Sequence, residues 1–281
     1  MQDDVVLGFI GQGYVGKSYA DEFESRGFSV VRYSQEEPYR ENGEKIKGAD
    51  IVFIAVPTPT KPEGFDLSII RAVLPLVGEG KVAVIKSTLL PGTTHALSEE
   101  FPSIRIVHSP EFLSEKTAHV DAQNPRRNIV GIPSRTSEYE DIAKKILSIL
   151  PPAPFELVCG AREAELIKYA NNTFLYSKVV FMNVLFDLAM AHGCIWEDIR
   201  NAMAHEPWIG DMHIDPVHKS GRGAGGACFI KDFAAFKGHY ETLMGHDTLG
   251  TALLAAIEKK NIALLQETGK DENILRGVYG G

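Results

Sequence analysis

Val5-Val-Leu-Gly-Phe-Ile-Gly-Gln-Gly-Tyr-Val-Gly16 places a short apolar run directly before three glycines at the spacing Gly-x-Gly-x-x-Gly. This spacing between a strand and a helix is typical of a dinucleotide-binding turn. The first glycine makes the tight turn, the second lets a pyrophosphate approach the backbone, and the third allows the helix to pack closely on the strand. We therefore predict a strand, this turn, and a helix to about Arg26. The expected cofactor contacts at the turn are Gly11, Gly13, Tyr14, Val15 and Gly16.

Further short apolar runs continue the pattern through the first half of the chain. They lie at 28–33, 51–56, 82–86, 104–107 and 128–131. Helical patterns separate several of them, and such alternation predicts a parallel sheet with helices on both faces. The expected fold class is α/β plus α: a Rossmann-like doubly wound domain over residues 1–158, followed by an all-helical domain over 159–281.

The helical half begins after Pro151-Pro-Ala-Pro154. From Ala161 to about His192 apolar residues recur at helical spacing, with no glycine or proline between them. At about 1.5 Å per residue, a helix of this length crosses a whole domain or forms an interface. We expect further helices over about 228–243 and 247–267, and a homodimer that buries one face of the long helix.

Composition excludes several classes of function. The 281 residues carry a net charge of −8, and no Lys/Arg run offers a footprint for nucleic acid. No apolar run approaches the roughly 20 residues of a membrane span. The N-terminal Met1-Gln-Asp-Asp4 lacks the basic region of a signal peptide, so we expect a cytoplasmic protein. Cys159 and Cys194 are expected to be small packing residues, and no Cys/His cluster suggests a metal.

The choice of cofactor is left open by the second strand. An acidic residue about 20 positions beyond the glycine turn bonds the adenine ribose of NAD. Here that strand ends Arg32-Tyr-Ser34, so a serine stands at the expected position. A serine with a nearby arginine could accommodate a 2′-phosphate. NAD is therefore the expected cofactor, and NADP is an open alternative.

One cysteine stands in a setting suited to chemistry. Gly223-Ala-Gly-Gly-Ala-Cys228-Phe-Ile-Lys-Asp232 places a thiol after a run of small residues and a carboxylate four positions later. Small residues let a backbone approach a ligand closely. If the chain becomes helical at Cys228, Asp232 lies one turn further on the same face. A flexible turn before an ordinary helix is the alternative reading.

Four further segments lie between the glycine turn and the Cys228 loop. They are Val56-Pro-Thr-Pro-Thr60, Lys86-Ser-Thr-Leu-Leu-Pro-Gly-Thr-Thr94, Ser109-Pro-Glu-Phe-Leu-Ser-Glu115 and Ala164-Glu-Leu-Ile-Lys168-Tyr-Ala-Asn-Asn172. Taken in order from residue 8 to 232, the six segments resemble the UDP-glucose/GDP-mannose dehydrogenase family.

The resemblance implies a reaction in which a nucleotide sugar is oxidised twice at C6, from alcohol to aldehyde to acid. Cys228 would attack the aldehyde, and Lys168 and Asn172, one helical turn apart, would stabilise an oxyanion. Asp232 would help to position water or a proton. The other implied catalytic residues are Glu111 and Thr88. The implied cofactor contacts beyond the glycine turn are Ser34, Val56, Pro57, Thr58, Ser87, Thr88 and Glu115. The implied substrate contacts are Glu111, Phe112, Leu113, Lys168, Asn172, Gly223, Gly225 and Gly226.

Two departures from the family concern the substrate. Family members usually continue into a second Rossmann-like domain that closes over the nucleotide, whereas this sequence stops at Gly281. A separate chain could supply that domain, it could have been removed, or the substrate could be smaller. Trp208-Ile-Gly210 stands where many members have Arg-Ile-Gly. Two alternative functions therefore stay open: a single-step dehydrogenase of the hydroxyacid type, and a non-catalytic dinucleotide-binding subunit that scaffolds another chain.

Overall fold

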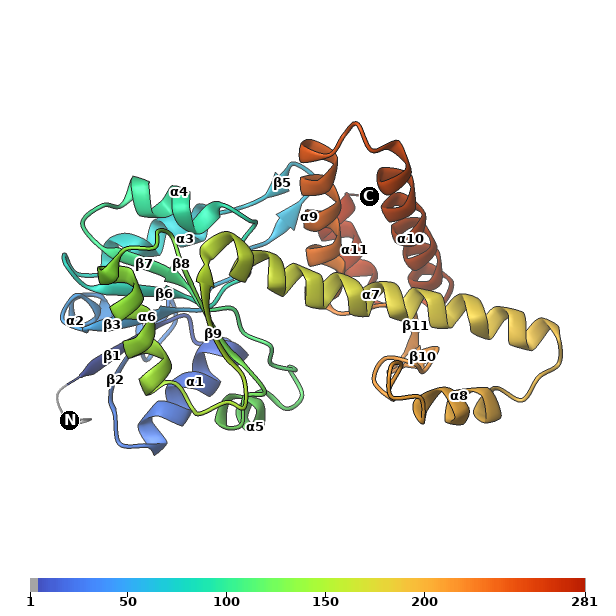
Figure 1. The fold of residues 1–281 in the computed structure, drawn as a ribbon, viewed down its shortest axis with the longest axis horizontal. Coiled ribbons are helices and arrows are strands. Elements are labelled where there is room, and N and C mark those ends of the chain that lie inside the picture. Colours follow the sequence, from blue (N-terminus) through green and yellow to red (C-terminus); the bar gives the residue numbers. More distant parts are fainter. Residues whose placement is uncertain (1–4, 281) are drawn as a thin grey trace. The chain divides into compact units, whose positions relative to one another are not determined.

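The computed structural model describes residues 5–280. The chain divides into two compact units. One contains the residues up to Thr58 together with Asp66–Lys168, and the other contains Pro59–Phe65 and the residues from Tyr169 onward. Figure 1 shows the sheet of the first unit and the helices of the second.

A seven-stranded sheet forms the centre of the first unit, in the order β2-β1-β3-β6-β7-β8-β9. Every neighbouring pair is parallel except β7 and β8, which are antiparallel. The strands are β1 (Val6–Ile10), β2 (Ser29–Tyr33), β3 (Ile51–Ile54), β6 (Val82–Ile85), β7 (Arg105–His108), β8 (Asn128–Ile132) and β9 (Glu156–Gly160).

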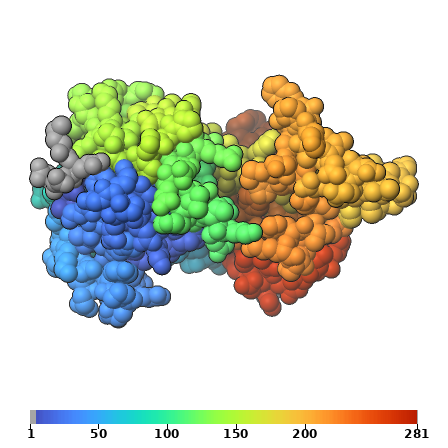
Figure 2. All heavy atoms as spheres, turned by 90° about the horizontal axis from the view of Figure 1, so that it is seen from below, coloured from blue at the N-terminus to red at the C-terminus, as the bar shows by residue number. Residues whose placement is uncertain are grey.

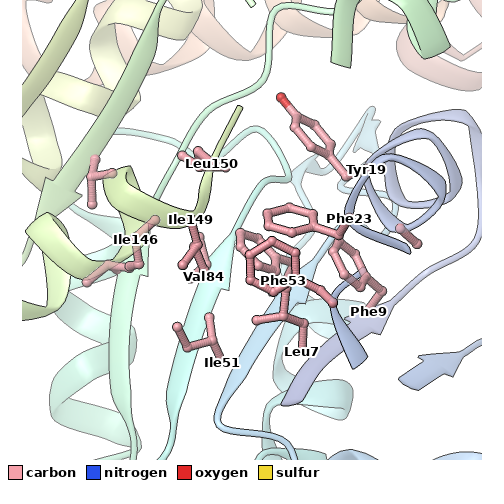
Figure 3. Close-up of a cluster of buried hydrophobic side chains, with 14 of the residues drawn as sticks. Leu7, Phe9, Tyr19, Phe23, Ile51, Phe53, Val84, Ile146, Ile149 and Leu150 are labelled. Atoms are coloured by element: carbon pink, nitrogen blue, oxygen red, sulfur yellow. The ribbon is translucent and has the colours of Figure 1, made fainter. Parts of the chain in front are cut away.

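Helices cover both faces of this sheet, as its apolar strands require. On one face, β1, β3 and β6 pack against the first, fifth and sixth helices. Figure 3 shows how Phe9, Phe23 and Phe53 meet there, with Phe9 and Phe53 stacked at 5.0 Å between ring centroids. The helices are α1 (Tyr14–Ser25), α2 (Gly43–Lys47), α3 (Ser68–Val73), α4 (Thr93–Glu100), α5 (Ala118–Gln123) and α6 (Ser137–Ile149). The opposite face is buried under α2, α3 and α4. In Figure 2 the blue residues of α1 adjoin the green residues of α5, against which they pack.

The predicted doubly wound sheet is confirmed, with two differences. The sheet is mixed rather than wholly parallel, because β8 runs opposite to β7. It also gains an edge strand, β9, in a segment where no strand was expected. Only five residues long, β9 alternates weakly in burial and follows the proline-rich segment 151–154, so its sequence carries little strand signal.

The second unit is mainly helical. α7 (Ala161–Ala191) confirms the helix predicted from 161 to about 192. It begins in the first unit and continues into the second after Lys168. The remaining helices are α8 (Trp196–Ala204), α9 (Ala227–Leu243), α10 (Thr248–Glu267) and α11 (Glu272–Tyr279). The short hairpins are β4 (Thr60–Lys61) with β5 (Gly64–Phe65), and β10 (Val217–His218) with β11 (Gly221–Arg222). Tyr176 of α7 stacks on Phe233 of α9 at 4.0 Å between centroids.

α7 is long and apolar enough, by length and composition alone, to cross a bilayer. Such a helix is also common in the cores of proteins that do not enter membranes. Several of its polar side chains are buried and paired within the protein, among them Lys168, Asn172 and Asn183. The helix therefore gives only weak support to a membrane role.

Candidate functional site

The glycine turn has the backbone geometry of a dinucleotide cradle. Gly11 has φ +92°, a conformation that favours glycine. A Cβ on Gly16 would collide with the carbonyl oxygen of Gly11, so this glycine permits α1 to pack against β1. A Cβ on Gly13 would meet nothing within 4 Å. Gly13 is the N-cap of α1, and no side chain among the described residues caps it. Open space and a helix N-terminus at one turn fit a pyrophosphate.

The residues at the end of β2 bear on the choice between NAD and NADP. The hydroxyl of Ser34 donates to the backbone oxygen of Glu36 at 2.8 Å. Arg32 is buried, and its Nη2 lies 2.7 Å from a carboxylate oxygen of Asp21 and 2.7 Å from one of Glu24. These two carboxylates neutralise the cation that the sequence offered to a 2′-phosphate. The geometry therefore favours NAD over NADP at this position.

Two loops at the carboxyl edge of the sheet are tied together. The Ser87 hydroxyl donates to the backbone oxygen of Val56 at 2.7 Å and accepts from its N–H at 3.0 Å. The Thr58 hydroxyl donates to the backbone oxygen of Thr88 at 2.9 Å. In an open α/β sheet, ligands bind beyond this edge. The structure thus brings together the predicted cofactor residues Val56, Pro57, Thr58, Ser87 and Thr88.

A buried ion pair joins two predicted site residues. Lys168 Nζ lies 2.8 Å from Glu111 Oε1 and also donates to the backbone oxygen of Glu111 at 2.7 Å. The second carboxylate oxygen of Glu111 accepts from the backbone N–H of Leu113 at 2.7 Å. Lys168 is only 4% exposed and Glu111 only 7%, so neither is the solvated surface residue that its type suggests. Glu115 is exposed.

Aromatic and basic side chains surround this pair. Phe112 lies 5.6 Å from Lys168 Nζ and 3.7 Å from the guanidinium of Arg127, measured to its ring centroid. Lys86 donates to the Ser109 hydroxyl at 3.1 Å and lies 4.4 Å above the ring of Tyr19. Burial, opposed by Glu111 and reinforced by Lys168, lowers the pKa of Lys86 to about 7. Lys86 lies in the segment 86–94 that carries the family resemblance, but no local sequence pattern predicts its burial or its place in the site.

A second polar cluster lies in the helical unit. Asp232 is 1% exposed, and its carboxylate accepts from Asn172 Nδ2 at 2.6 Å and from Lys231 Nζ at 2.5 Å. The Asn172 side-chain oxygen accepts from the amide of Asn171 at 3.1 Å, which fixes the orientation of the Asn172 amide. Lys231 was not singled out from the sequence, although it directly precedes Asp232.

Cys228 stands in the first turn of α9, half-buried, with Asp232 one turn further along the same helix. The chain is therefore helical at Cys228, which is the condition under which Asp232 was expected to lie one turn further on the same face. The loop before it contains Gly223, Gly225 and Gly226, the last of which is the N-cap of α9 with φ +84°. The two other cysteines differ from each other. Cys159 is buried, and burial raises the pKa of its thiol to about 11. Cys194 is exposed, so its predicted packing role was wrong.

Within residues 5–280, no group of three or more His, Cys, Asp or Glu side chains is arranged to hold a metal ion. The polar groups that gather in each unit are instead hydrogen-bonded to one another.

Comparison with known proteins gives two matches to one family. Residues 34–150 match the model of the UDP-glucose/GDP-mannose dehydrogenase family, NAD binding domain. Residues 162–262 match the model of the central domain of the same family. The first match begins after the glycine turn, which independently has the geometry described above.

Individual relatives agree with these matches. A UDP-glucose 6-dehydrogenase of Pseudomonas aeruginosa is 34% identical over 233 residues, which are 78% of this chain and 49% of that protein. The solved UDP-glucose dehydrogenase of Pyrobaculum islandicum is 30% identical with a TM-score of 0.78, covering 95% of this chain and 69% of that one. The chain spans about half the length of the curated relatives it matches.

A 3-hydroxyisobutyrate dehydrogenase of Mycobacterium tuberculosis shares the fold at 16% identity. Its TM-score is 0.72, and the likeness covers 97% of this chain and 98% of that one. At this identity the likeness concerns the fold alone.

Proposed function

Because the chain belongs to the UDP-glucose/GDP-mannose dehydrogenase family, we propose that it oxidises the C6 primary alcohol of a nucleotide sugar to the carboxylate, with NAD as cofactor. The sugar is of the UDP-glucose, GDP-mannose or UDP-N-acetylhexosamine type. The observation that carries the proposal is the placement of Cys228 on the first turn of α9, one turn before the buried and doubly hydrogen-bonded Asp232.

Cys228 supplies the nucleophile for the second oxidation. When bound, NAD accepts one hydride in each of the two oxidations. The Cys228 sulfur forms a bond to the aldehyde carbon, giving a thiohemiacetal whose oxidation leaves a thioester. Water then attacks the thioester carbon, the carbon–sulfur bond breaks, and the thiol of Cys228 is restored as the carboxylate leaves. Asp232, held by Asn172 and Lys231, orients that water and accepts its proton.

Lys168 stabilises the negative charge that develops on the substrate oxygen. An ammonium has three N–H donors, and Glu111 accepts from two of them. The third can donate to a substrate oxygen at no cost to the ion pair. Such a charge-assisted donor in a water-poor site strongly favours the transition state. Glu111 fixes the ammonium, Thr88 holds water for the first oxidation, and Asn172 stands one helical turn beyond Lys168 on α7.

Residues of the first unit would hold the cofactor. The backbone at Gly13 and the first turn of α1 would bind the pyrophosphate, and Ser34 would contact the adenine ribose. The tied loops at 56–58 and 87–88 would contact the nicotinamide half. Glu115, which is exposed, lies on the loop that would approach the nicotinamide. Phe112, Leu113, Gly223, Gly225 and Gly226 are the proposed substrate contacts.

A homodimer through α7 completes the proposal. Phe174, Phe181 and Leu188 are 69%, 61% and 56% exposed and recur every seven residues on this helix. Residues at this spacing lie along one helix face, and an exposed apolar stripe marks an interaction surface. A second copy of the chain offers the same stripe, which suits a two-fold interface. Phe181→Glu should lower the mass measured in solution to that of one chain, whereas an unchanged dimer would contradict the interface.

The function is tested with a panel of UDP- and GDP-sugars, each incubated with the chain and either NAD or NADP. The expected result is formation of a uronic acid from at least one sugar, identified by mass spectrometry, with reduced NAD formed in parallel. An aldehyde as the end product would point to a single-step dehydrogenase. No turnover of any nucleotide sugar would contradict the proposal and favour a non-catalytic role.

A further inference from the structure

Hydrogen bonds to neighbouring segments fix most residues of the glycine-rich loop 221–226, which precedes Cys228. Its neighbours on the helical unit are the turn between α10 and α11, residues 268–271, and Asn261 of α10. Asn261 makes a two-way pair with Ala224, accepting from its N–H at 2.7 Å and donating to its carbonyl at 3.0 Å. Arg222, at the start of the loop, has its N–H bonded to the Thr268 hydroxyl at 3.1 Å. The composition that suggests a flexible loop is therefore misleading.

Lys270 occupies the centre of this arrangement. Its ammonium donates to the carbonyl oxygens of Gly223 at 2.9 Å and Gly221 at 3.3 Å, and the side chain is only 5% exposed. Burial lowers the pKa of Lys270, and Asp271 partly opposes that effect. A buried ammonium lowers the stability of the fold unless hydrogen-bond acceptors surround it. The two loop carbonyls are such acceptors, and through them Lys270 holds the loop.

Asp271 holds the other end of the loop. Its carboxylate accepts from the N–H of Gly226 at 2.7 Å, and Gly226 is the N-cap of the helix that carries Cys228. Asp271 itself has φ +56°, a left-handed conformation that few residues other than glycine adopt. A Cβ on Gly225 would collide with the side chains of both Lys270 and Asp271. The loop glycines thus serve close approach to this turn. α9 and α11 pack against each other and lie side by side in Figure 1.

We propose that Lys270 and Asp271 are positioning residues for Cys228: together they fix the loop from Gly221 to Gly226 so that the thiol is presented at one place. Neither residue needs to touch the substrate. The proposal rests on the proposed function in one respect only, that Cys228 is the nucleophile of the second oxidation. Pre-organisation of this kind matters because a misplacement of about 1 Å at a reacting group can cost about a hundredfold in rate.

The first test does not depend on turnover. Hydrogen exchange is measured for peptides covering 221–228 in the full chain and in Lys270→Met, which removes the ammonium but keeps an unbranched side chain. Lys259→Met, on the exposed side of α10, is the matched control. We expect exchange of the loop amides to be at least tenfold faster in Lys270→Met and unchanged in Lys259→Met. Unchanged exchange in Lys270→Met would overturn the clamp. If that variant does not fold, Asp271→Ala, which frees the Gly226 N–H, gives the same comparison.

The second test separates positioning from a general loss of structure. The aldehyde of the substrate is supplied directly, and its oxidation is compared with that of the alcohol. In Lys270→Met we expect kcat for aldehyde oxidation to fall at least tenfold and by more than the rate of alcohol oxidation, with KM for NAD within twofold of the parent chain. A faster-exchanging loop with an unchanged aldehyde rate would overturn the positioning role. If the parent chain oxidises no nucleotide sugar, the proposed function fails, while hydrogen exchange still decides whether the clamp exists.

Discussion

The side-chain amide of Asn172 on α7 donates a 2.6 Å hydrogen bond to the carboxylate of Asp232 on α9, sixty positions later in the sequence. Both side chains are buried. Asn172 belongs to the sequence segment that contains Lys168, and Asp232 belongs to the segment that contains Cys228. The bond therefore links these two segments. In Asn172→Ala the buried Asp232 carboxylate would keep Lys231 but lose the Asn172 donor, which typically costs about 1–3 kcal/mol. The two sequence motifs therefore depend on each other physically.

The glycines of the dinucleotide turn should separate binding from folding. Gly13→Ala adds a Cβ into open space at an ordinary φ of −68°, so the fold should be retained. The added methyl occupies the position that a pyrophosphate needs, and we expect NAD affinity to fall at least tenfold, or about 1.4 kcal/mol. Calorimetric titration measures it. Gly16→Ala should instead destabilise the chain, because its Cβ would collide with the Gly11 carbonyl. Equal NAD affinity in Gly13→Ala and the parent would contradict the cradle.

The buried pair of Lys168 and Glu111 separates stability from catalysis. Lys168→Met leaves the Glu111 carboxylate buried without its partner, a change that typically costs about 3–5 kcal/mol. Turnover should fall about 10²–10³-fold, the scale for losing one oxyanion donor. The double variant Lys168→Met/Glu111→Gln should regain much of the stability and none of the turnover. Urea unfolding and steady-state kinetics measure the two effects. A double variant with parental turnover would return this pair to a purely structural role.

Cofactor preference should follow the two carboxylates beside Arg32. Asp21 and Glu24 neutralise this guanidinium and would repel a 2′-phosphate, so NAD should bind more tightly than NADP. Asp21→Asn/Glu24→Gln frees the cation, and NADP affinity should rise by about tenfold, or about 1.4 kcal/mol, with NAD affinity nearly constant. Fluorescence titration with each reduced cofactor makes the comparison. Parallel changes for both cofactors would mean that Arg32 does not face the ribose.

Lys86 should make stability depend on pH. Its pKa is about 7 in the folded protein and that of an ordinary lysine, 10.5, when unfolded. Between these values the unfolded chain binds a proton that the folded protein does not, so the free energy of unfolding rises with pH, by about 1.4 kcal/mol per pH unit for this group. Below about pH 7 both states are protonated and the contribution is constant. Lys86→Met should lack this slope, measured by urea unfolding between about pH 7.5 and 9. Equal slopes would place the Lys86 pKa outside this window.

Much of the first unit could be predicted because local signals and burial agree there. The strands β1, β2, β3 and β6 are apolar runs bounded by turn residues, and the glycine turn has one geometry that explains its spacing. The antiparallel pairing of β8 could not be predicted, because strand direction depends on the connection and not on composition. The edge strand β9 has too few buried positions to show a pattern.

Some residues of the candidate site could be predicted from the sequence and others could not, because only local patterns can be recognised there. Cys228, Asp232, Lys168 and Asn172 stand in segments whose spacing is meaningful within a single helix. Lys270 and Asp271 do not, because their partners lie about fifty residues earlier in the chain and contact them only through the folded loop. A lysine followed by an aspartate between two helices is typical of a solvent-exposed turn. The folded structure shows instead that Lys270 is buried and bonded to two loop carbonyls.

Counting reduced cofactor per sugar consumed in Cys228→Ser tests the role of this cysteine, with Cys194→Ser as the control for loss of an exposed thiol. We expect two reduced NAD for each nucleotide sugar in the parent chain and in Cys194→Ser. In Cys228→Ser we expect no acid product and at most one reduced NAD per sugar, with NAD affinity unchanged. Two reduced NAD and full acid formation in Cys228→Ser would contradict the role of this cysteine and the mechanism built on it.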